Sequence, residues 1–206
     1  MNLAVFASGE GSNFSAIAKT IKQGKLKVEL KILVCDKPEA RVVKRAKSAG
    51  VRVVLIRRED FCSRQDFETA IIQKLIDYRI DLIALAGFMR LLSPVFVKRY
   101  RNRIMNIHPS LLPAFKGAHA IKDAFESKVK VTGVTVHFVD ELMDNGPVIL
   151  QQAVKIEEAD TVETLEEKMH RVEHKLYPRA IQLFVEGRLK IEGRKVKVSG
   201  PNLSSK

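Results

Sequence analysis

The chain has 206 residues, of which 46% are hydrophobic and 29% are charged, which fits one ordinary globular domain with a sizeable core. No apolar stretch approaches the roughly 18 residues of a membrane helix, and the first residues lack the order of a signal peptide. Cys35 and Cys62 are too few for a disulfide framework or a cysteine-based zinc site. We therefore expect a cytoplasmic protein without a membrane partner.

The formal net charge of +12 admits two classes of protein, a nucleic-acid binder and an enzyme for anionic small molecules. Six Lys/Arg and one acidic residue lie between residues 188 and 206, and a second basic cluster occupies residues 98–103. Neither cluster alternates with aromatic residues, as a surface that stacks single-stranded bases does. We therefore expect small-molecule substrates and no nucleic-acid partner.

The first half of the chain alternates short apolar runs with amphipathic segments. The runs predict strands at 2–7, 30–35, 51–56 and 81–86, and the segments predict helices after Gly11, between Pro38 and Gly50, and at 65–79. The alternation indicates an α/β fold: a single-domain, Rossmann-like, mostly parallel sheet with right-handed crossovers and helices on both faces.

A glycine-containing turn follows the first predicted strand and opens a helix. Gly9 and Gly11 mark this turn, and Ser12 or Asn13 is expected to cap the helix. Backbone amides at a helix N-terminus attract phosphate where glycines allow it to approach. The turn matches neither G-x-G-x-x-G nor a P-loop, so a plain tight turn with a capped helix is the alternative.

The stretch IMNIHPSLLPAFKG, residues 104–117, begins like a buried strand and is then broken by prolines. Asn106 and His108 are two residues apart, so an extended chain points both side chains to one side. An amide donor beside a group that titrates near neutral pH suits acyl transfer, in which an oxyanion forms and an amine loses a proton. A single His at a strand end can also be purely structural.

Ligands of parallel sheets bind beyond the carboxyl ends of the strands. Three segments are expected at that edge: the turn Gly9–Asn13, the segment Gly87–Leu92 after the fourth strand, and the pair Asn106 and His108. Their convergence favours a chemical role for the pair.

The second half predicts strands at 131–139 and 148–156, which the short turn between them makes antiparallel. Gly133, Thr135 and His137 share one face of the first of these strands. His137 is expected to be a buried, hydrogen-bonded residue and not a catalytic one.

A long helix is predicted over residues 160–188. Asp160 and Glu163 resemble a capping box, and Pro178 should kink the helix. A small hairpin around Glu192–Gly193 and a frayed tail at 200–206 should follow.

Five motifs occur in one order: SGEGSN, AGFMRLLSP, NIHPSLLP, GVTVHFVDELMDNGPVI and EHKLYP. Together they resemble the folate-dependent formyltransferases, and the GSN turn narrows the resemblance to the phosphoribosylglycinamide formyltransferase family. The resemblance implies a formyltransferase domain over residues 1–190 and a short hairpin and basic tail at 191–206. It implies formyl transfer from 10-formyltetrahydrofolate to the amine of phosphoribosylglycinamide in purine synthesis, by a monomer or homodimer that uses no metal.

The resemblance also implies roles for particular residues. Asn106, His108 and Asp144 form the implied catalytic trio, in which the carboxylate raises the His108 pKa so that the imidazolium and the Asn106 amide stabilise an oxyanion. The implied ribonucleotide contacts are Gly11, Ser12, Asn13, His170, Arg171, Val172 and Glu173. The implied folate contacts are Arg64, Met89, Arg90, Leu91, Leu92, Asn106, Val139 and Asp140.

Two positions depart from the family pattern. Glu10 lies beside the implied phosphate turn and would repel phosphate unless its side chain points away. Asn145 stands where a glycine is familiar.

Three other functions stay open. Formyltetrahydrofolate deformylase would use the same trio to pass the formyl group to water, and methionyl-tRNA formyltransferase would explain the positive charge. We expect an additional N-terminal domain in the first and an additional C-terminal domain in the second. His170, Glu173 and His174 match the H-x-x-E-H motif of zinc proteases, although no third ligand is evident.

Overall fold

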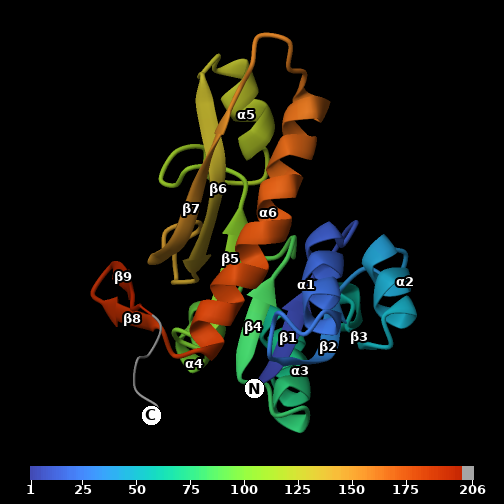
Figure 1. Cartoon of the computed structure of the whole chain (residues 1–206). Helices are drawn as coiled ribbons and strands as arrows, with labels where there is room; N and C mark the ends of the chain where they lie inside the picture. The colour runs from blue at the N-terminus through green and yellow to red at the C-terminus, as the bar shows by residue number, and fades with distance from the viewer. Residues whose placement is uncertain (201–206) are drawn as a thin grey trace. The chain divides into compact units, whose positions relative to one another are not determined.

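A computed structural model describes residues 1–200 of the chain (Figure 1). The chain divides into two compact units, the first from Met1 to Asn106 and the second from Ile107 onward. The boundary falls inside one strand, Ile104–His108. Of the tail predicted to be frayed, residues 201–206 lie outside the described residues.

In the first unit, parallel strands alternate with helices. The strands are β1 (Asn2–Phe6), β2 (Glu29–Cys35), β3 (Arg52–Leu55), β4 (Leu82–Leu85) and β5 (Ile104–His108), in the order β3-β2-β1-β4-β5. The helices are α1 (Ser12–Lys22), α2 (Arg41–Ser48), the 3-10 turn η1 (Arg58–Asp60), α3 (Arg64–Asp77) and α4 (Pro94–Arg99). The predicted α/β class with its parallel strands is confirmed.

The strand order reverses at β1, whose neighbours are β2 and β4. Right-handed crossovers therefore place α1 and α2 on one face of these strands and α3 and α4 on the other. A reversal of this kind opens a crevice beyond the carboxyl ends of the two central strands, which is where open α/β sheets bind ligands.

The segments after β1 and β4 meet at that edge, as the sequence predicts. Ser8 N donates a hydrogen bond to Gly87 O at 3.0 Å, and Met89 N donates to Ser8 Oγ at 3.1 Å. Asn106 pairs with Leu85, the last residue of β4. The segments after β1 and β4, together with Asn106 of β5, therefore lie at the carboxyl edge of the first unit.

The second unit contains β6 (Val131–Phe138), β7 (Val148–Lys155), β8 (Leu189–Glu192) and β9 (Lys195–Val198). β6 and β7 pair antiparallel, as do β8 and β9, and β9 joins β7 in parallel. Its helices are α5 (Ala120–Glu126) and α6 (Val162–Val185), and α6 packs along β6 and β7 (Figure 1). The predicted antiparallel strands and the hairpin are confirmed.

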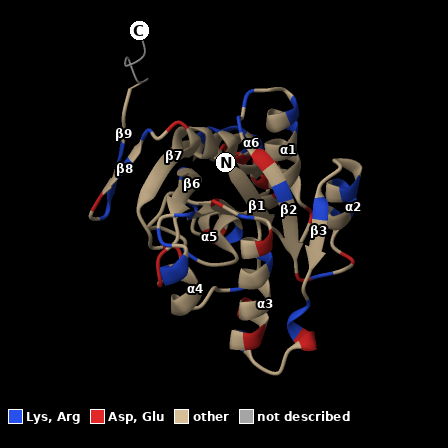
Figure 2. Cartoon of the chain, turned by 90° about the horizontal axis from the view of Figure 1, so that it is seen from below, with Lys and Arg blue, Asp and Glu red and all other residues tan. Residues whose placement is uncertain are grey.

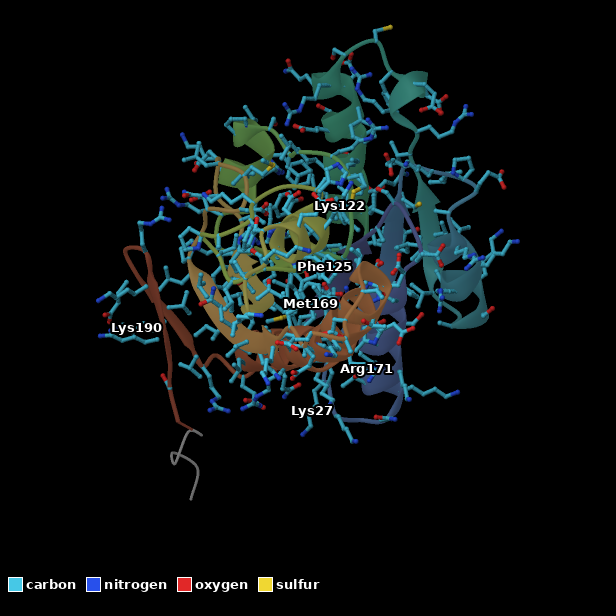
Figure 3. The ribbon with its side chains drawn as sticks, turned by 90° about the horizontal axis from the view of Figure 1, so that it is seen from above. Lys27, Lys122, Phe125, Met169, Arg171 and Lys190 are labelled. Atoms are coloured by element: carbon cyan, nitrogen blue, oxygen red, sulfur yellow. The ribbon has the colours of Figure 1, made fainter. Side chains whose placement is uncertain are left out.

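Each unit has its own apolar core. In the first, the ring of Phe6 meets the rings of Phe88 and Phe96 edge to face, at 5.3 and 6.4 Å between centroids. In the second, Met169 in the first half of α6 is fully buried (Figure 3), and the rings of Phe138 and Phe184 lie 6.1 Å apart. Each such side chain contributes about 1.5–3 kcal/mol of hydrophobic stabilisation.

The structure corrects both predicted helix caps. Gly11, in the left-handed conformation with φ 74°, precedes α1 where Ser12 or Asn13 was expected to cap. At α6 the capping box is formed by Thr161 and Thr164, one residue later than the predicted pair, since each threonine hydroxyl accepts the other's backbone N–H.

The sequence predicts neither α4 nor α5, because six or seven residues are too few to establish a helical period. α4 does carry a start signal, since Ser93 caps it and Pro94 occupies its first position. His119 precedes α5 without a side-chain cap, so α5 has no comparable signal.

Lys and Arg residues are spread over several elements, α2 and the β8–β9 hairpin among them (Figure 2). Between residues 1 and 200, none of the helices combines the length and the apolar composition needed to cross a membrane.

Candidate active site

β5 ends with His108, whose imidazole is buried between two hydrogen-bond acceptors. Nε2 lies 2.8 Å from the carbonyl oxygen of Phe115, and Nδ1 lies 3.4 Å from Asp144 Oδ2. A carbonyl oxygen and a carboxylate oxygen only accept hydrogen bonds, so both ring nitrogens of His108 face acceptors. These two neighbours fix the orientation of the ring at the end of β5.

Asp144 lies in the loop between β6 and β7 with a left-handed backbone, φ 48°. Its Oδ2 also accepts a hydrogen bond from Gly117 N at 2.9 Å, and its Oδ1 lies 3.8 Å from His137 Nε2. Phe115, whose carbonyl faces His108, is also left-handed, with φ 49°. A non-glycine residue in this conformation costs about 1 kcal/mol or more, so two strained residues hold His108 in place.

His137, on β6, is 2% exposed, and its Nδ1 lies 2.8 Å from the carbonyl oxygen of Phe138. Burial lowers the pKa of His137, and the hydrogen bond to Phe138 and the charge of Asp144 only partly oppose this. His137 is therefore neutral at pH 7, with its proton on Nδ1. The prediction of a buried, hydrogen-bonded histidine is confirmed.

The same face of β6 fixes the segment that follows His108. Thr135 Oγ1 donates to Ser110 O at 2.6 Å and accepts from Leu112 N at 3.1 Å. A Cβ atom at Gly133 would lie 2.5 Å from Leu111 Cδ2, so only glycine leaves room for this segment. The shared face of Gly133, Thr135 and His137, which strand periodicity predicts, thus supports the bend beyond the histidine.

A pocket of about 210 Å³ adjoins Asp144 in the second unit. Both apolar side chains and two cationic side chains line it. The lining includes Leu112, Pro113, Lys116, Asp144, Val148 and Arg194.

In the first unit, a left-handed glycine precedes the N-terminus of α1. Gly11 precedes Ser12 and Asn13, and a Cβ atom at Gly11 would lie 2.5 Å from Val42 Cγ2. Glu10 is exposed and pairs with Arg41 at 3.0 Å. The Glu10 carboxylate is therefore held by a cation of α2, which answers the first departure from the family pattern.

A buried polar network, which the sequence reasoning missed, joins the turn after β1 to the segment after β4. Asp36 is 3% exposed; its Oδ1 accepts from Ser8 Oγ at 2.6 Å and its Oδ2 from Arg90 Nε at 2.5 Å. The available signal was an acidic residue immediately after a buried strand, at the edge where ligands bind. The side chain of Arg90 is thereby turned toward Asp36.

Arg64, the first residue of α3, contacts the same segment. Its Nη2 donates to Leu91 O at 2.6 Å and its Nε to Glu68 Oε1 at 3.1 Å, while Ser93 N donates to the same Glu68 oxygen at 2.7 Å. Met89 and Leu91 are 65% and 66% exposed. The structure thus brings Arg64 together with the predicted folate segment and leaves apolar side chains exposed there.

The remaining predicted folate residues are half-buried. Leu92 closes the segment after β4, while Val139 and Asp140 open the loop after β6. In that loop Asp140 Oδ2 accepts from Asn145 Nδ2 at 2.9 Å. The second departure, Asn145, is thus built into the loop that carries Asp144.

The predicted ribonucleotide-binding residues on α6 include both buried and exposed side chains. Glu173 is 5% exposed. The burial of Tyr177 raises the pKa of the Tyr177 hydroxyl, and the nearby charge of Glu173 raises it further. Arg171 is exposed and pairs with Glu167 at 3.2 Å (Figure 3). Of these residues, Glu173 is the buried ionisable group.

The H-x-x-E-H motif on α6 forms a stacked pair. The ring planes of His170 and His174 are nearly parallel, with an angle of 8° between them and 6.1 Å between the ring centroids. Val172, which lies between the two histidines in the sequence, is half-buried. Among residues 1–200, no three His, Cys, Asp or Glu side chains are grouped to hold a metal ion. The zinc-protease alternative therefore gains no support from the fold.

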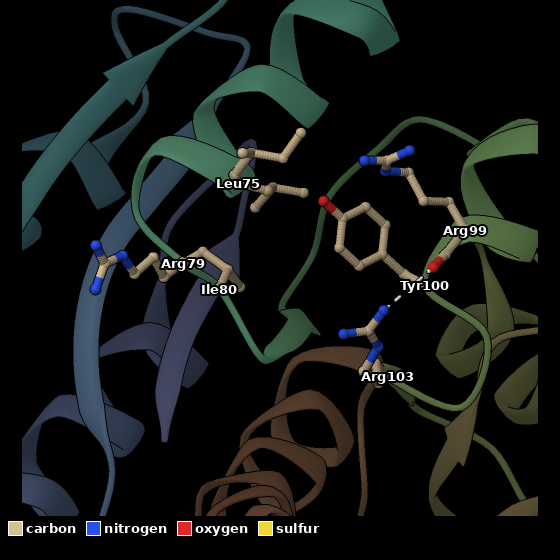
Figure 4. Close-up of a pocket in the computed structure, with 7 residues that line it drawn as sticks. Leu75, Arg79, Ile80, Arg99, Tyr100 and Arg103 are labelled. Carbon is tan, nitrogen blue, oxygen red and sulfur yellow. Dashed lines mark hydrogen bonds between the residues drawn. The ribbon is translucent and has the colours of Figure 1, made fainter.

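A second pocket, of about 410 Å³, lies in the first unit (Figure 4). It is lined by Leu75, Ile80 and Tyr100, and by Arg103, which donates to Arg99 O at 3.3 Å and lies over the Tyr100 ring. Because Ile80 precedes β4 and Arg103 precedes β5, this pocket lies at the amino ends of the strands. It is therefore remote from the carboxyl edge where the candidate residues of this unit gather.

Comparison with known proteins relates the chain to formyltransferases. The family model described as formyl transferase matches residues 1–181. Phosphoribosylglycinamide formyltransferase of Bacillus subtilis is 48% identical over 179 residues, 87% of this chain and 92% of that protein. The Escherichia coli protein of the same name is 37% identical over 203 residues, 98% of this chain and 96% of that protein.

A solved structure extends the agreement to the fold. Glycinamide ribonucleotide transformylase 1 from Symbiobacterium toebii matches with a TM-score of 0.95 and 43% identity, over 97% of this chain and 94% of that one. The chain therefore belongs to the formyl transferase family, among the phosphoribosylglycinamide formyltransferases.

Proposed function

We propose that the chain transfers a formyl group from 10-formyltetrahydrofolate to the amine of phosphoribosylglycinamide. The single observation that carries the proposal is His108, held between the Phe115 carbonyl and the Asp144 carboxylate. In the proposed reaction this ring carries a positive charge, and a fixed positive charge stabilises an oxyanion as it forms.

The reaction forms a bond from the amine nitrogen to the formyl carbon and then breaks the bond from that carbon to the folate nitrogen. The His108 imidazolium stabilises the negative oxygen of the intermediate. Asn106, two residues earlier on β5, supplies an amide N–H donor to the same oxygen. Asp144 keeps the imidazolium charged and, through water, relays the proton that leaves the amine to the folate nitrogen.

The binding roles follow the chemistry of each segment. The left-handed Gly11 turn, with Ser12 and Asn13, presents backbone amides at a helix N-terminus to the substrate phosphate. The buried Glu173 carboxylate, with its neighbours His170, Arg171 and Val172, is proposed to bind the ribonucleotide.

The folate would be bound by the guanidinium of Arg64 and by the segment Met89–Leu92. The exposed apolar side chains of that segment suit the flat rings of the cosubstrate. Val139 and Asp140 are proposed to contact it from the loop after β6. These roles need small-molecule partners alone, and a monomer or homodimer in the cytoplasm can fulfil them.

The competing function is hydrolysis of the formyl-folate, with water in place of the amine. The two reactions are separated by following loss of 10-formyltetrahydrofolate with and without phosphoribosylglycinamide. We expect loss to require the ribonucleotide and formylated product to appear one for one. Equal loss without the ribonucleotide would overturn the proposed acceptor.

The assay has a matched control within the second unit. His108→Asn should abolish most of the ribonucleotide-dependent turnover. His119→Asn changes an exposed histidine at the start of α5 to a residue that caps helices well, and should leave turnover near that of the wild type.

A further inference from the structure

We propose that Arg194, in the turn of the β8–β9 hairpin, is a positioning residue for Asp144. The hairpin follows the segment that the family model matches, which ends at residue 181. The inference rests on the proposed role of Asp144 in formyl transfer, and it gives the basic hairpin a function in the same site.

The guanidinium of Arg194 contacts both ends of the loop that carries Asp144. Its Nη2 donates to the backbone carbonyl of Asn145 at 2.5 Å, and its Nη1 lies 3.8 Å from Asp140 Oδ2. The Asn145 side chain completes this network, because its Nδ2 donates to the same Asp140 oxygen at 2.9 Å. One side chain therefore fixes the peptide unit between Asn145 and Gly146, the second after Asp144, relative to the start of the loop.

The loop needs such a constraint because its backbone is strained at the residue that matters. Asp144 is left-handed, and a non-glycine residue keeps that conformation only where its surroundings hold it there. On the far side the loop is pinned at Gly146, where a Cβ atom would lie 1.9 Å from Phe138 O. The tip residues Leu142 and Met143 are 66% and 51% exposed, so packing there constrains the loop little.

Backbone pairing aims Arg194 at the loop. β9 joins β7 through the pair Val148 and Lys195, and Val148 is two residues beyond Gly146. Gly193, with φ 60°, turns the hairpin directly before Arg194. The strand register therefore places Arg194, the residue before Lys195, beside the end of the loop.

A different reading assigns Arg194 a purely electrostatic role. Arg194 and Lys116 both line the pocket beside Asp144, and their charges would attract anionic substrates. The two roles differ in kinetics. Attraction changes KM and its salt dependence, whereas positioning of Asp144 changes kcat, because the carboxylate acts in the transition state.

The test compares Arg194→Ala, Arg194→Lys and Lys195→Ala in the full-length enzyme. Lys195 is exposed and is the first residue of β9, directly after Arg194, so its replacement removes one positive charge beside the same turn. We expect kcat of Arg194→Ala to fall about tenfold, with both KM values within about twofold, because a displaced catalytic group loses rate steeply. Arg194→Lys should recover part of the loss, since an ammonium can still donate to the Asn145 carbonyl, and Lys195→Ala should match the wild type.

Amide hydrogen exchange over residues 140–146 supplies a readout that is independent of activity. The proposal expects faster exchange there in Arg194→Ala and unchanged exchange in Lys195→Ala. Unchanged exchange, an unchanged kcat, or a rise in KM alone would overturn it. If the wild type transferred no formyl group, the proposed function would fail, and faster loop exchange in Arg194→Ala would still support the contact that holds the loop.

Discussion

The turn after β1 and the loop after β6 share a backbone feature but differ in the residue that adopts it. Each presents polar groups beyond a strand end, and each depends on a left-handed residue. In the turn that residue is Gly11, for which the left-handed conformation has no steric cost. In the loop it is Asp144, whose Cβ atom makes the same conformation less favourable. A turn that offers backbone amides can use glycine, whereas a site that needs a carboxylate must tolerate the strain.

The contacts that hold the two segments differ accordingly. Gly11 is constrained mainly by its own helix and by the close approach of Val42. Asp144 is held by groups far apart in the sequence, among them Gly117 N and the ring of His108. Gly11 therefore depends on close packing against one residue of α2, whereas Asp144 depends on polar contacts made by its carboxylate.

The largest expected effect concerns the charge in the loop. Asp144→Asn keeps a residue that tolerates the left-handed backbone but removes the charge. We expect kcat to fall by about 10²–10³, the usual loss when an oxyanion loses one stabilising group, because His108 would no longer be kept charged; Tm should change little. Asp123→Asn on α5 serves as a control of equal charge. Near-normal turnover of Asp144→Asn would refute the role of its charge.

The comparison of the two left-handed positions is sharpened by a pair of glycines. Gly11 and Gly24 have φ of 74° and 71°, but a Cβ atom meets nothing within 4 Å at Gly24. Gly24→Ala should cost about 1 kcal/mol for the backbone alone, and Gly11→Ala about 2–4 kcal/mol because it also displaces Val42. Denaturant unfolding measures both, and equal costs would show that the clash at Gly11 is relieved without strain.

A smaller effect is expected from pH. Burial lowers the pKa of His137, so below its ordinary value of about 6.5 the unfolded chain binds a proton that the folded chain does not. The free energy of unfolding should therefore rise with pH up to about 6.5, by at most about 1.4 kcal/mol per pH unit, and this contribution should be constant above it. His137→Gln should flatten that slope in urea unfolding between pH 5 and 7.5. An identical slope would place the titration elsewhere.

The smallest effect is expected on the hairpin, away from Arg194. Lys190 is exposed and pairs with Glu192 at 3.0 Å (Figure 3). Lys190→Glu should leave kcat and KM within about twofold, because exposed pairs contribute little and salt screens their charge. A collapse of activity at unchanged Tm would mean that the charge of the hairpin, and not a single contact, acts on the site.

Much of the fold could be predicted from the sequence, because each long helix or strand has a periodic pattern of apolar residues. The parallel strands, the antiparallel pair and α6 follow from runs of buried residues with turn residues between them. The caps were misassigned by one residue because several polar residues stand in a row at each helix start, and only backbone geometry selects Gly11 and Thr161. α5 escaped prediction since its seven residues carry no start signal.

The candidate site divides in the same way. The sequence by itself determined the spacing of Asn106 and His108 on one strand and the glycine turn before α1, because alternation and helix starts are properties of neighbouring residues. Only the tertiary structure decided that His108 lies between Asp144 and a backbone carbonyl, and that Arg194 reaches the loop from the last strands. Contacts between residues far apart in the chain depend on strand register and loop path, and no local pattern encodes them.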